Sequence, residues 1–557
     1  MLEIKPSNKN WHTRGDDTAA RIAAAAPYAH GKIVDPADTV KLLEAVLRPG
    51  DKVNIEGDNQ KQADFLAKKL CEVDPAKVHD LHMIQSTLSI PEHLDVFDKG
   101  IARKLDFAYA GSQGKRLAQM VQNDGIELGA IHTYLEMYSR YFIDLVPRVS
   151  LVCADAADKD GNIYTGFSTE DTPAIVEATK FNQGIVIFQV NKMVDKLPRV
   201  DIPADWVDFV IESPTPYMLN PLFTRDPAKI TNDRIMKAMM AIKGIYAEYG
   251  VKVLNHGVGF DTAAVELLLP TFGESLGLKG KICTHWVLNP HPTLIPAIET
   301  GWVQAVYSFG SEVGMEEYIK ARPDIFAIGP DGTMRSNRAF CQAAGHYAAD
   351  MFIGSTMQID KYGNSSTATK NNVAGFGGAP NMGCDAKGRR HVTPAWQKAG
   401  AEVANRFELM GDANRGKKLV VQMITTVSAK GFPGFVEQLD AVALKKNANL
   451  DLEPIMIYSD DLTNIVSEVG IAYLHKCHNM EERMDAIRAV AGNTEVGKLE
   501  DPEITKKLRK EGIVKLPEDL GINPADATRD LLAAKNMKDL VDWSGGLYNP
   551  PAKFRNW

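Results

Sequence analysis

The two stretches Val149-Ser-Leu-Val-Cys153 and Ile185-Val-Ile-Phe-Gln-Val190 decide the fold class. Each is a short and almost wholly apolar run, which is typical of a strand that is buried on both faces of a parallel sheet. A helical pattern over Thr172 to Thr179 lies between them. Strand, helix and strand in this order predict an α/β fold with largely parallel sheets.

The same alternation continues on both sides of this segment. Lys52 to Ile55 is a predicted strand, and a predicted helix follows from Gln60 to Cys71. The turn formers of Asp158 to Asn162 predict a hairpin connection. Prolines and other turn formers make Glu212 to Asp226 the expected linker, and a second α/β set begins near Ile230. We therefore expect two tandem domains, residues 1–225 and 226–490, followed by a charged helical extension over residues 491–557.

Composition favours a cytoplasmic enzyme. The 557 residues carry 63 Lys and Arg against 71 Asp and Glu, a formal net charge of −8 with both signs interspersed, which argues against a nucleic-acid partner. No apolar run reaches the roughly 18 residues that a membrane span needs, and the polar first residues do not resemble a signal peptide. The six cysteines have no framework spacing, so we expect reduced thiols.

A glycine-rich segment is the strongest candidate for chemistry. Residues 373–383 read VAGFGGAPNMG. Such a loop can cradle a phosphate or the oxyanion of an acyl-transfer intermediate with its backbone N–H groups. Pro380 breaks the dinucleotide fingerprint, and no Gly-Lys-Ser/Thr follows as in a P-loop. A tight surface turn is the alternative.

The residues around this loop resemble the acyl-CoA transferase family. That family has a segment of the type INSAxEVDxxGQVN that leads to GxGGxxDF, and five positions before the loop match it: Ile353, Ser355, Ile359, Asp360 and Gly363. Gln358 and Asn381 depart from it. Further matches lie in Arg148 to Gly166, Phe188 to Asn191 and Ile465 to Leu474. The resemblance spans roughly residues 45–490 and implies two CoA-transferase-like domains. It also implies oxyanion donors at Gly377 and Gly378, and contacts with a CoA-like moiety at Gly375, Phe376, Ala379 and Asn381.

One departure concerns the catalytic nucleophile. The family's glutamate follows a GxG segment, here Gly257-Val-Gly259, by about thirty residues, and it forms an acyl anhydride and a thioester. The corresponding region reads KICTHWVLNPH over residues 281–291, and there is no Glu between Glu274 and Glu299. Trp286, Val287 or Leu288 would fall at the nucleophile position. Because a hydrocarbon cannot form an anhydride, the resemblance predicts that the substrate carboxylate itself attacks.

Within this family the chain is most similar to the malonate decarboxylase alpha subunits. The similarity rests on THWVLNPHPT over residues 284–293, on the run from Met357 to Gly383, and on the charged C-terminal extension. It implies the exchange acetyl-carrier + malonate giving malonyl-carrier + acetate. It also implies an acyl carrier protein and decarboxylase subunits as partners. The carrier's thiol would belong to a phosphoribosyl-dephospho-CoA group, which CoA replaces, with no tightly bound cofactor and no metal.

Further polar residues are candidates for this site. Asn289 and His285 lie where the nucleophile segment should be, and they would hydrogen-bond the thioester or the anhydride. A dicarboxylate needs a cation or several N–H donors, for which Arg335 and Arg338 are candidates. Gln189 and Asn191 would line the substrate cleft. For each pair a structural role is the alternative.

Other functions stay open at this stage. The chain could be a citrate lyase alpha subunit or a CoA-transferase that uses Glu299 or Glu312 as its nucleophile. It could also be a non-catalytic scaffold for the carrier protein. A homo-oligomer is compatible with all of these functions.

Overall fold

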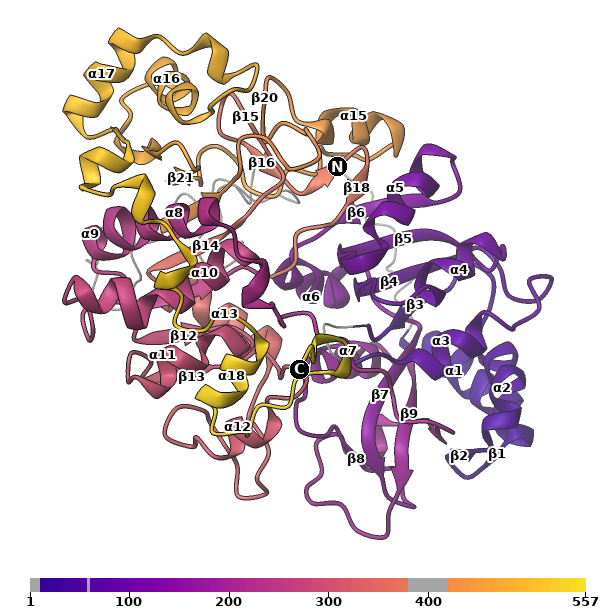
Figure 1. Cartoon of the computed structure of the whole chain (residues 1–557). Coiled ribbons are helices and arrows are strands. Elements are labelled where there is room, and N and C mark those ends of the chain that lie inside the picture. The colour runs from indigo at the N-terminus through magenta and orange to yellow at the C-terminus, as the bar shows by residue number, and fades with distance from the viewer. Residues whose placement is uncertain (1–10, 58–60, 379–418) are drawn as a thin grey trace, which may run out of the picture. The chain divides into compact units, whose positions relative to one another are not determined.

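The computed structural model describes residues 11–57, 61–378 and 419–557 (Figure 1). The chain divides into two compact units. The first comprises residues 1–113, 123–130 and 136–220, and the second comprises residues 114–122, 131–135 and 221–557. The three-domain division predicted above, with boundaries after residues 225 and 490, stays a prediction.

The first unit is built on a ten-stranded sheet in the order β1-β2-β10-β9-β7-β3-β4-β5-β6, with β8 paired to β7. Neighbours from β2 to β5 in this order pair in parallel, whereas β1 and β8 pair antiparallel. The bounds are β1 Ala29–His30, β2 Ile33–Val34, β3 Lys52–Ile55, β4 Leu81–Thr87, β5 Ala102–Tyr109, β6 Glu127–Ile131, β7 Val149–Ala157, β8 Ile163–Tyr164, β9 Ile185–Met193 and β10 Phe209–Glu212. The expected α/β fold is confirmed.

The segment that predicted the fold forms the middle of this sheet. β7 and β9 lie side by side (Figure 1), in a parallel register that starts at Val149 and Ile185. Both runs are buried over the predicted residues, as strands covered on two faces should be. Between β7 and β8 the Asp158 carboxylate accepts hydrogen bonds from the N–H groups of Asp160 and Asn162, which closes the predicted hairpin turn.

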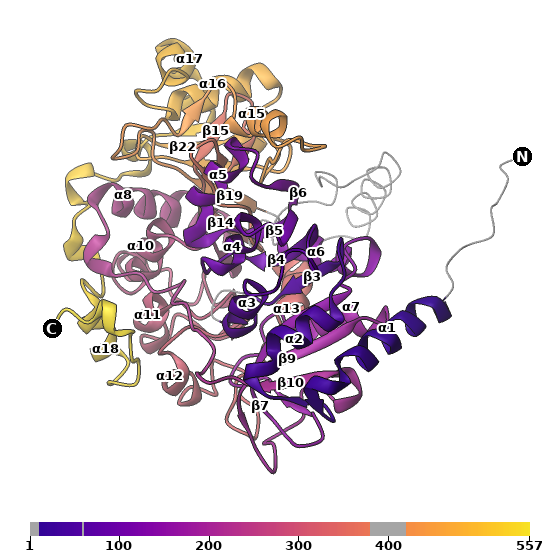
Figure 2. The same ribbon diagram turned by 90° about the vertical axis from the view of Figure 1, so that its right-hand side faces the viewer.

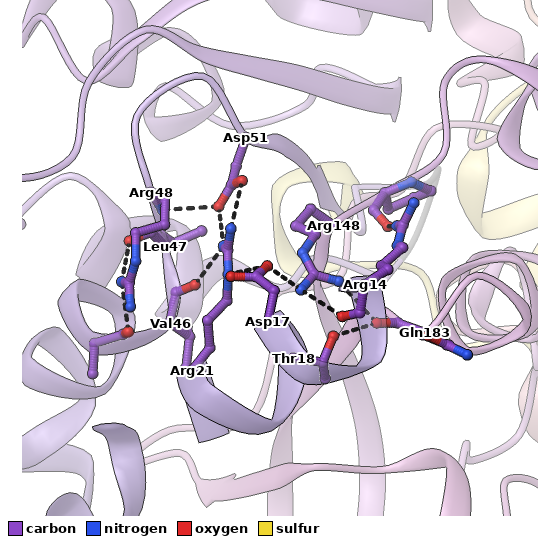
Figure 3. A network of polar contacts seen from close by, with 12 residues as sticks. Arg14, Asp17, Thr18, Arg21, Val46, Leu47, Arg48, Asp51, Arg148 and Gln183 are labelled. Carbon is purple, nitrogen blue, oxygen red and sulfur yellow. Dashed lines mark hydrogen bonds and ion pairs between the residues drawn. The ribbon is translucent and has the colours of Figure 1, made fainter. Parts of the chain in front are cut away.

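The helices of the first unit are α1 Trp11–Ala25, α2 Thr39–Val46, α3 Asp64–Leu70, α4 Glu92–Asp98, α7 Thr172–Phe181 and most of α6 Tyr134–Ile143. Of these, α3, α4 and α7 contact strands of the sheet, and α1 packs against α2. Polar contacts tie α1 to the rest of the unit (Figure 3). The Arg21 guanidinium donates to Val46 O at 2.9 Å and pairs with Asp51. Arg148 pairs with Asp17 and donates to Gln183 O at 2.9 Å. The N-terminal helix is thus held by charged groups as well as by apolar contacts.

The second unit contains an eight-stranded sheet in the order β13-β12-β11-β14-β19-β21-β22-β23. The neighbours from β13 to β21 pair in parallel, and the last two pairs are antiparallel. The bounds are β11 Val253–His256, β12 His285–Val287, β13 Ala305–Tyr307, β14 Met351–Ser355, β19 Leu419–Met423, β21 Asn464–Val466, β22 Ile471–Tyr473 and β23 Val514–Lys515. Short strands form two small sheets: β15 Gln358–Asp360, β16 Ser365–Ser366 and β20 Phe435–Val436, and β17 Ala368–Thr369 with β18 Asn372–Val373.

The helices of the second unit are α5 Gly114–Gln122, α8 Asn232–Ala241, α9 Ala247–Tyr249, α10 Phe260–Leu268, α11 Ile295–Glu299, α12 Glu316–Lys320, α13 Arg338–Ala348, α15 Asp440–Asn447, α16 Met480–Val490, α17 Pro502–Glu511 and α18 Met537–Trp543. α8 and α10 pack against one another (Figure 2). None of the helices in the described ranges is long and apolar enough to cross a bilayer.

Candidate active site

The candidate site lies at the edge of the second sheet that is formed by the carboxyl ends of its parallel strands, which we call the ligand edge. In open α/β sheets, ligands bind outside the carboxyl ends of the strands. Five neighbouring strands, β13, β12, β11, β14 and β19, run parallel, so their carboxyl ends share one edge. His256 ends β11, and Asn289 and Ser308 follow β12 and β13. The second unit therefore has a ligand edge that carries polar residues.

The glycine loop is held by hydrogen bonds to its carbonyl groups. Gly375 and Gly377 have φ values of 78° and 65°, a region that costs residues with a side chain roughly 1–2 kcal/mol. Thr367 donates its hydroxyl to Gly375 O, and Tyr134 donates its N–H to Gly377 O at 3.0 Å. Thr133 and Gly377 form a parallel β-bridge. The loop is therefore fixed by contacts with residues 133–134, which the sequence analysis did not single out.

Gly378 is needed because other side chains approach it closely. A Cβ atom at this position would lie 1.7 Å from Nε2 of Gln342 and 2.7 Å from Cδ2 of Tyr134. Arg338 lies one helical turn before Gln342 in α13, and its guanidinium is 5.0 Å from the centre of the Tyr134 ring. Arg338 and Gln342 are both completely buried. The structure thus brings one predicted cation to the same cluster as the predicted oxyanion loop.

Arg335 is in a different environment. Its guanidinium pairs with Asp331 at 2.8 Å, and 41% of its side chain is exposed. It also donates to the Thr333 hydroxyl at 3.0 Å. These contacts make a surface ion pair within one turn of chain, and nothing in them points to a bound dicarboxylate. Arg338 is the better supported of the two predicted cations.

The two candidates from the nucleophile segment separate along β12. His285 is the first residue of the strand, bonds to the Thr284 hydroxyl at 2.9 Å and stacks on Tyr307. It therefore lies at the amino end, away from the ligand edge. Asn289 follows the carboxyl end, is buried, and donates its amide N–H to Ser311 O at 3.0 Å. The position of Asn289 is compatible with contact to a ligand at this edge. The position of His285 does not support its predicted contact with the thioester or the anhydride.

The hydrocarbon side chains at the nucleophile position belong to the core. Trp286, Val287 and Leu288 are buried, and the Trp286 indole donates to Cys283 O at 2.8 Å. The two alternative carboxylates are engaged elsewhere. Glu312 accepts the N–H of Thr224 at 3.0 Å and its hydroxyl at 2.6 Å, and Glu299 pairs with Arg322 at 2.6 Å. Neither glutamate has the surroundings of an activated nucleophile.

A buried carboxylate with two imidazoles was missed by the sequence analysis. Glu266 in α10 accepts hydrogen bonds from Nδ1 of His256 and Nδ1 of His291, each at 2.8 Å, and from the Thr293 hydroxyl. Nε2 of His256 lies 2.7 Å from the Tyr246 hydroxyl. Burial opposes ionisation of Glu266, but the charge and hydrogen bonds of His291 and His256 outweigh it and lower the pKa to about 2. A carboxylate so stabilised is a poor nucleophile and a good positioning group.

Gln189 and Asn191 belong to the first unit, where both are engaged in internal contacts. The buried Gln189 amide accepts the Leu66 N–H at 3.0 Å and donates to Asp64 at 3.1 Å. Asn191 accepts the Tyr217 N–H at 2.8 Å and donates to Asp155 at 3.3 Å. These bonds fit the structural alternative, in which both side chains fasten β9 to its neighbours.

Two of the predicted contacts with the CoA-like moiety cannot be placed. Ala379 and Asn381 lie outside the described residues. Phe376 is 5% exposed, so little of it is available to a ligand. Within the described ranges, no group of three or more His, Cys, Asp or Glu could hold a metal ion.

Comparisons with known proteins agree with this architecture. The sequence model of the family described as "malonate decarboxylase, alpha subunit, transporter" matches residues 10–557. The chain belongs to the malonate decarboxylase alpha subunit family. The family predicted from the sequence is thus confirmed, and the match includes both units and the glycine loop.

Individual relatives of this family are similar over their whole length. An acetyl-S-ACP:malonate ACP transferase from Malonomonas rubra is 65% identical over 550 residues, which are 99% of each chain. The crystal structure of a Pseudomonas malonate decarboxylase hetero-tetramer in complex with malonate contains a chain that is 55% identical. The match covers 99% of this chain and 100% of that one, with a TM-score of 0.92. The malonate decarboxylase alpha subunit from Acinetobacter baumannii is also 55% identical, over 98% and 100% of the chains, with a TM-score of 0.90.

Proposed function

We propose that the chain exchanges the acyl group on a carrier thioester, converting acetyl-carrier and malonate into malonyl-carrier and acetate. The observation that carries this proposal is the 65% identity, over 99% of both chains, to the transferase from Malonomonas rubra. The same reaction was expected from the sequence. Citrate is the runner-up substrate from the sequence alone, and the full-length similarity to the malonate enzyme favours malonate.

The chemistry proceeds without a nucleophile from the protein. A malonate carboxylate oxygen attacks the acetyl carbonyl carbon, a C–O bond forms, and the C–S bond breaks to release the carrier thiolate. The thiolate then attacks the malonyl carbonyl of the mixed anhydride, and acetate leaves with the bridging oxygen. No proton is gained or lost overall. The lack of an available carboxylate in the nucleophile segment supports this direct route.

The protein's contribution is positioning and oxyanion stabilisation. The N–H groups around Gly377 and Gly378 donate to the acyl oxygen as it becomes negative. Arg338 neutralises malonate, and its cation is held by the Tyr134 ring at 5.0 Å. Asn289 orients the substrate from the loop after β12. Glu266 keeps His291 in a single orientation at this edge.

The carrier and its partners follow from the same proposal. The Pseudomonas relative is part of a hetero-tetramer, and we infer that this chain works with an acyl carrier protein and decarboxylase subunits in the cytoplasm. The acyl group would sit on a phosphoribosyl-dephospho-CoA thiol of the carrier. Because that group ends like CoA, acetyl-CoA should serve as a substitute.

The first test is acyl exchange by the purified chain. Acetyl-CoA is mixed with malonate or citrate, and the new thioester is identified by mass spectrometry; each reaction is repeated with the acetylated carrier protein. Malonyl thioester is the expected product. Formation of citryl thioester in place of malonyl thioester would move the assignment to citrate. Absence of any new thioester with the carrier would overturn the proposal.

The route of attack is tested by following oxygen in a single turnover. With protein in excess and malonate labelled with ¹⁸O in its carboxylates, direct attack puts one ¹⁸O into the first acetate released. A glutamate nucleophile would instead release unlabelled acetate, because the leaving oxygen comes from the enzyme, and the label would remain on the protein. Unlabelled acetate in the first turnover would therefore contradict direct attack.

A further inference from the structure

Gln342 has a buried carboxamide without any hydrogen-bond partner. The residue is 0% exposed, and neither Oε1 nor Nε2 has a partner anywhere in the part of the chain that the structure describes. Burying an amide without compensation is unfavourable, and native proteins pair the large majority of such atoms. A position that keeps this group at a cost to stability is a candidate for function, since unsatisfied groups concentrate at sites that bind a ligand.

The carboxamide points to the glycine loop. A Cβ atom on Gly378 would lie 1.7 Å from Nε2 of Gln342 and 2.6 Å from Cδ. The end of the glutamine side chain therefore occupies the space that a side chain at position 378 would fill. Since an amide nitrogen carries two N–H donors, Gln342 offers N–H groups beside the backbone of the glycine loop.

Helix α13, which carries Gln342, is fastened in its first half. Asn337 caps the helix by accepting the Phe340 N–H at 2.8 Å. The Cys341 thiol, next to Gln342, contacts Ser308 O at 3.3 Å, just after the carboxyl end of β13. These contacts fix the first half of α13 over the ligand edge. A donor held in this way needs no reorganisation when charge develops, which is what an oxyanion site requires.

We propose that Gln342 is a catalytic residue whose Nε2–H donates to the acyl oxygen during both additions. This inference rests on the proposed function. In the first step the carboxylate oxygen of malonate bonds to the acetyl carbon, and the carbonyl electron pair moves onto the acyl oxygen. The Gln342 N–H and the loop N–H groups stabilise that oxyanion until it expels the thiolate. The return attack of the thiolate on the malonyl carbon uses the same donors. A neutral donor suits both steps because it does not repel malonate.

The test compares two variants with a matched control. Gln342→Met keeps the length of the side chain and removes the donor, and Gln342→Glu keeps the shape. The control is Asn464→Leu: Asn464 is also completely buried with an unpartnered carboxamide, but it is the first residue of β21, at the amino end of that strand. Steady-state exchange from acetyl-carrier to malonate and thermal unfolding are measured on the full chain.

The expected result separates function from stability. Gln342→Met and Gln342→Glu should lower kcat about 10²–10³-fold, the usual loss for one oxyanion donor. For Gln342→Met the KM for malonate should stay within about threefold, because the donor acts mainly in the transition state. Gln342→Met should unfold at the same temperature as the wild type or higher, because an unsatisfied polar group has been removed. Asn464→Leu should also unfold at the wild-type temperature or higher, and its kcat should stay within about threefold of the wild-type value.

Two results would overturn the inference while leaving the proposed function intact. One is an active wild type with a Gln342→Met variant of unchanged kcat. The other is a raised KM for malonate at constant kcat, which would mean that the carboxamide holds the substrate and not the oxyanion. A wild type that makes no malonyl thioester even with the carrier would overturn the proposed function, and the inference with it.

Discussion

Nδ1 of His291 lies 2.8 Å from Oε1 of Glu266, and both side chains are buried. This contact joins α10 to the loop after β12, the region in which the wider family carries its nucleophile. Because an ionised carboxylate only accepts hydrogen bonds, Nδ1 of His291 must be the donor. Nε2 of His291 is then left without a partner among the described residues, with the ring stacked on Phe223 at 5.1 Å. The carboxylate near the expected position thus organises imidazoles and is not free for attack.

Glu266→Gln should therefore destabilise the protein strongly. The amide oxygen can still accept from both imidazoles, but the negative charge is lost and an N–H group replaces the oxygen that accepts the Thr293 hydroxyl. Breaking one partner of a buried charged network costs about 3–5 kcal/mol. Urea unfolding followed by circular dichroism measures the loss. The matched control is Glu299→Gln, which removes a half-buried carboxylate paired with Arg322 and should cost about 1 kcal/mol or less. Equal effects of the two changes would contradict the assigned role of Glu266.

The sequence allowed the sheet to be predicted better than the site. β3 occupies the predicted residues 52–55. β7 and β9 start at the predicted residues, because nearly continuous apolar runs between turn formers have few alternatives. Residues 351–360 are divided into two short strands, β14 and β15. Gly354 weakens the strand pattern of β14. A Cβ atom at position 354 would lie 3.3 Å from Cα of Gly257. The glycine therefore allows the backbones of residues 354 and 257 to approach closely.

The residues around the glycine loop could not be found in the same way. Tyr134 and Gln342 are far from Gly378 in the chain, and no local pattern marks either of them. Their approach results from the tertiary fold, which single-sequence reasoning does not see. His291 had a weak signal, as a polar residue between prolines in 290–292, but His285 offered the same residue type in the same segment. Only the register of β12 separates the two.

Acid should weaken the protein through His93. Burial lowers the pKa of this imidazole to about 3 from 6.5, with Nδ1 accepting the Ser89 N–H at 3.2 Å. The folded state therefore favours the neutral ring, and below pH 6.5 the unfolded state binds a proton that the folded state does not. The contribution of His93 to the free energy of unfolding is complete above pH 6.5. It falls by about 1.4 kcal/mol for each pH unit as the pH drops from 6.5 toward 3.

Urea unfolding at several pH values between 7.5 and 4.5 checks this dependence. His93→Leu removes the titrating group, so its unfolding free energy should fall less steeply with acid than that of the wild type. His79→Leu, which changes an exposed imidazole, should keep the wild-type slope. Parallel curves for the wild type and His93→Leu would contradict the prediction.

The polar network of Figure 3 makes Arg21 important for holding α1. Its guanidinium pairs with Asp51 and Asp17 and donates a hydrogen bond to Val46 O, and its side chain is only 8% exposed. Arg21→Met should cost about 2–4 kcal/mol in unfolding free energy, because it leaves the nearly buried Asp51 carboxylate without this partner. Lys41→Met, which breaks the exposed pair with Asp38, should leave the unfolding midpoint unchanged. A midpoint for Arg21→Met close to that of the wild type would mean that α1 is held by apolar contacts alone.

Gly378→Ala should abolish exchange through a clash with Gln342. The new Cβ would meet Nε2 at 1.7 Å, so the carboxamide must move out of place. Gly377→Ala is a contrasting change: its φ of 65° makes a side chain strained, but the nearest atom is 3.9 Å away. It should therefore cost about 1–2 kcal/mol in stability and leave Gln342 in position.

The double variant Gly378→Ala with Gln342→Ala should be more stable than Gly378→Ala alone, because the clash with the carboxamide is removed. The recovery should be only partial, since Tyr134 would still lie 2.7 Å from the Cβ, and the double variant should remain inactive. A double-mutant cycle of unfolding free energies measures the coupling. If the two losses simply add, the side chain of Gln342 does not occupy the space beside Gly378.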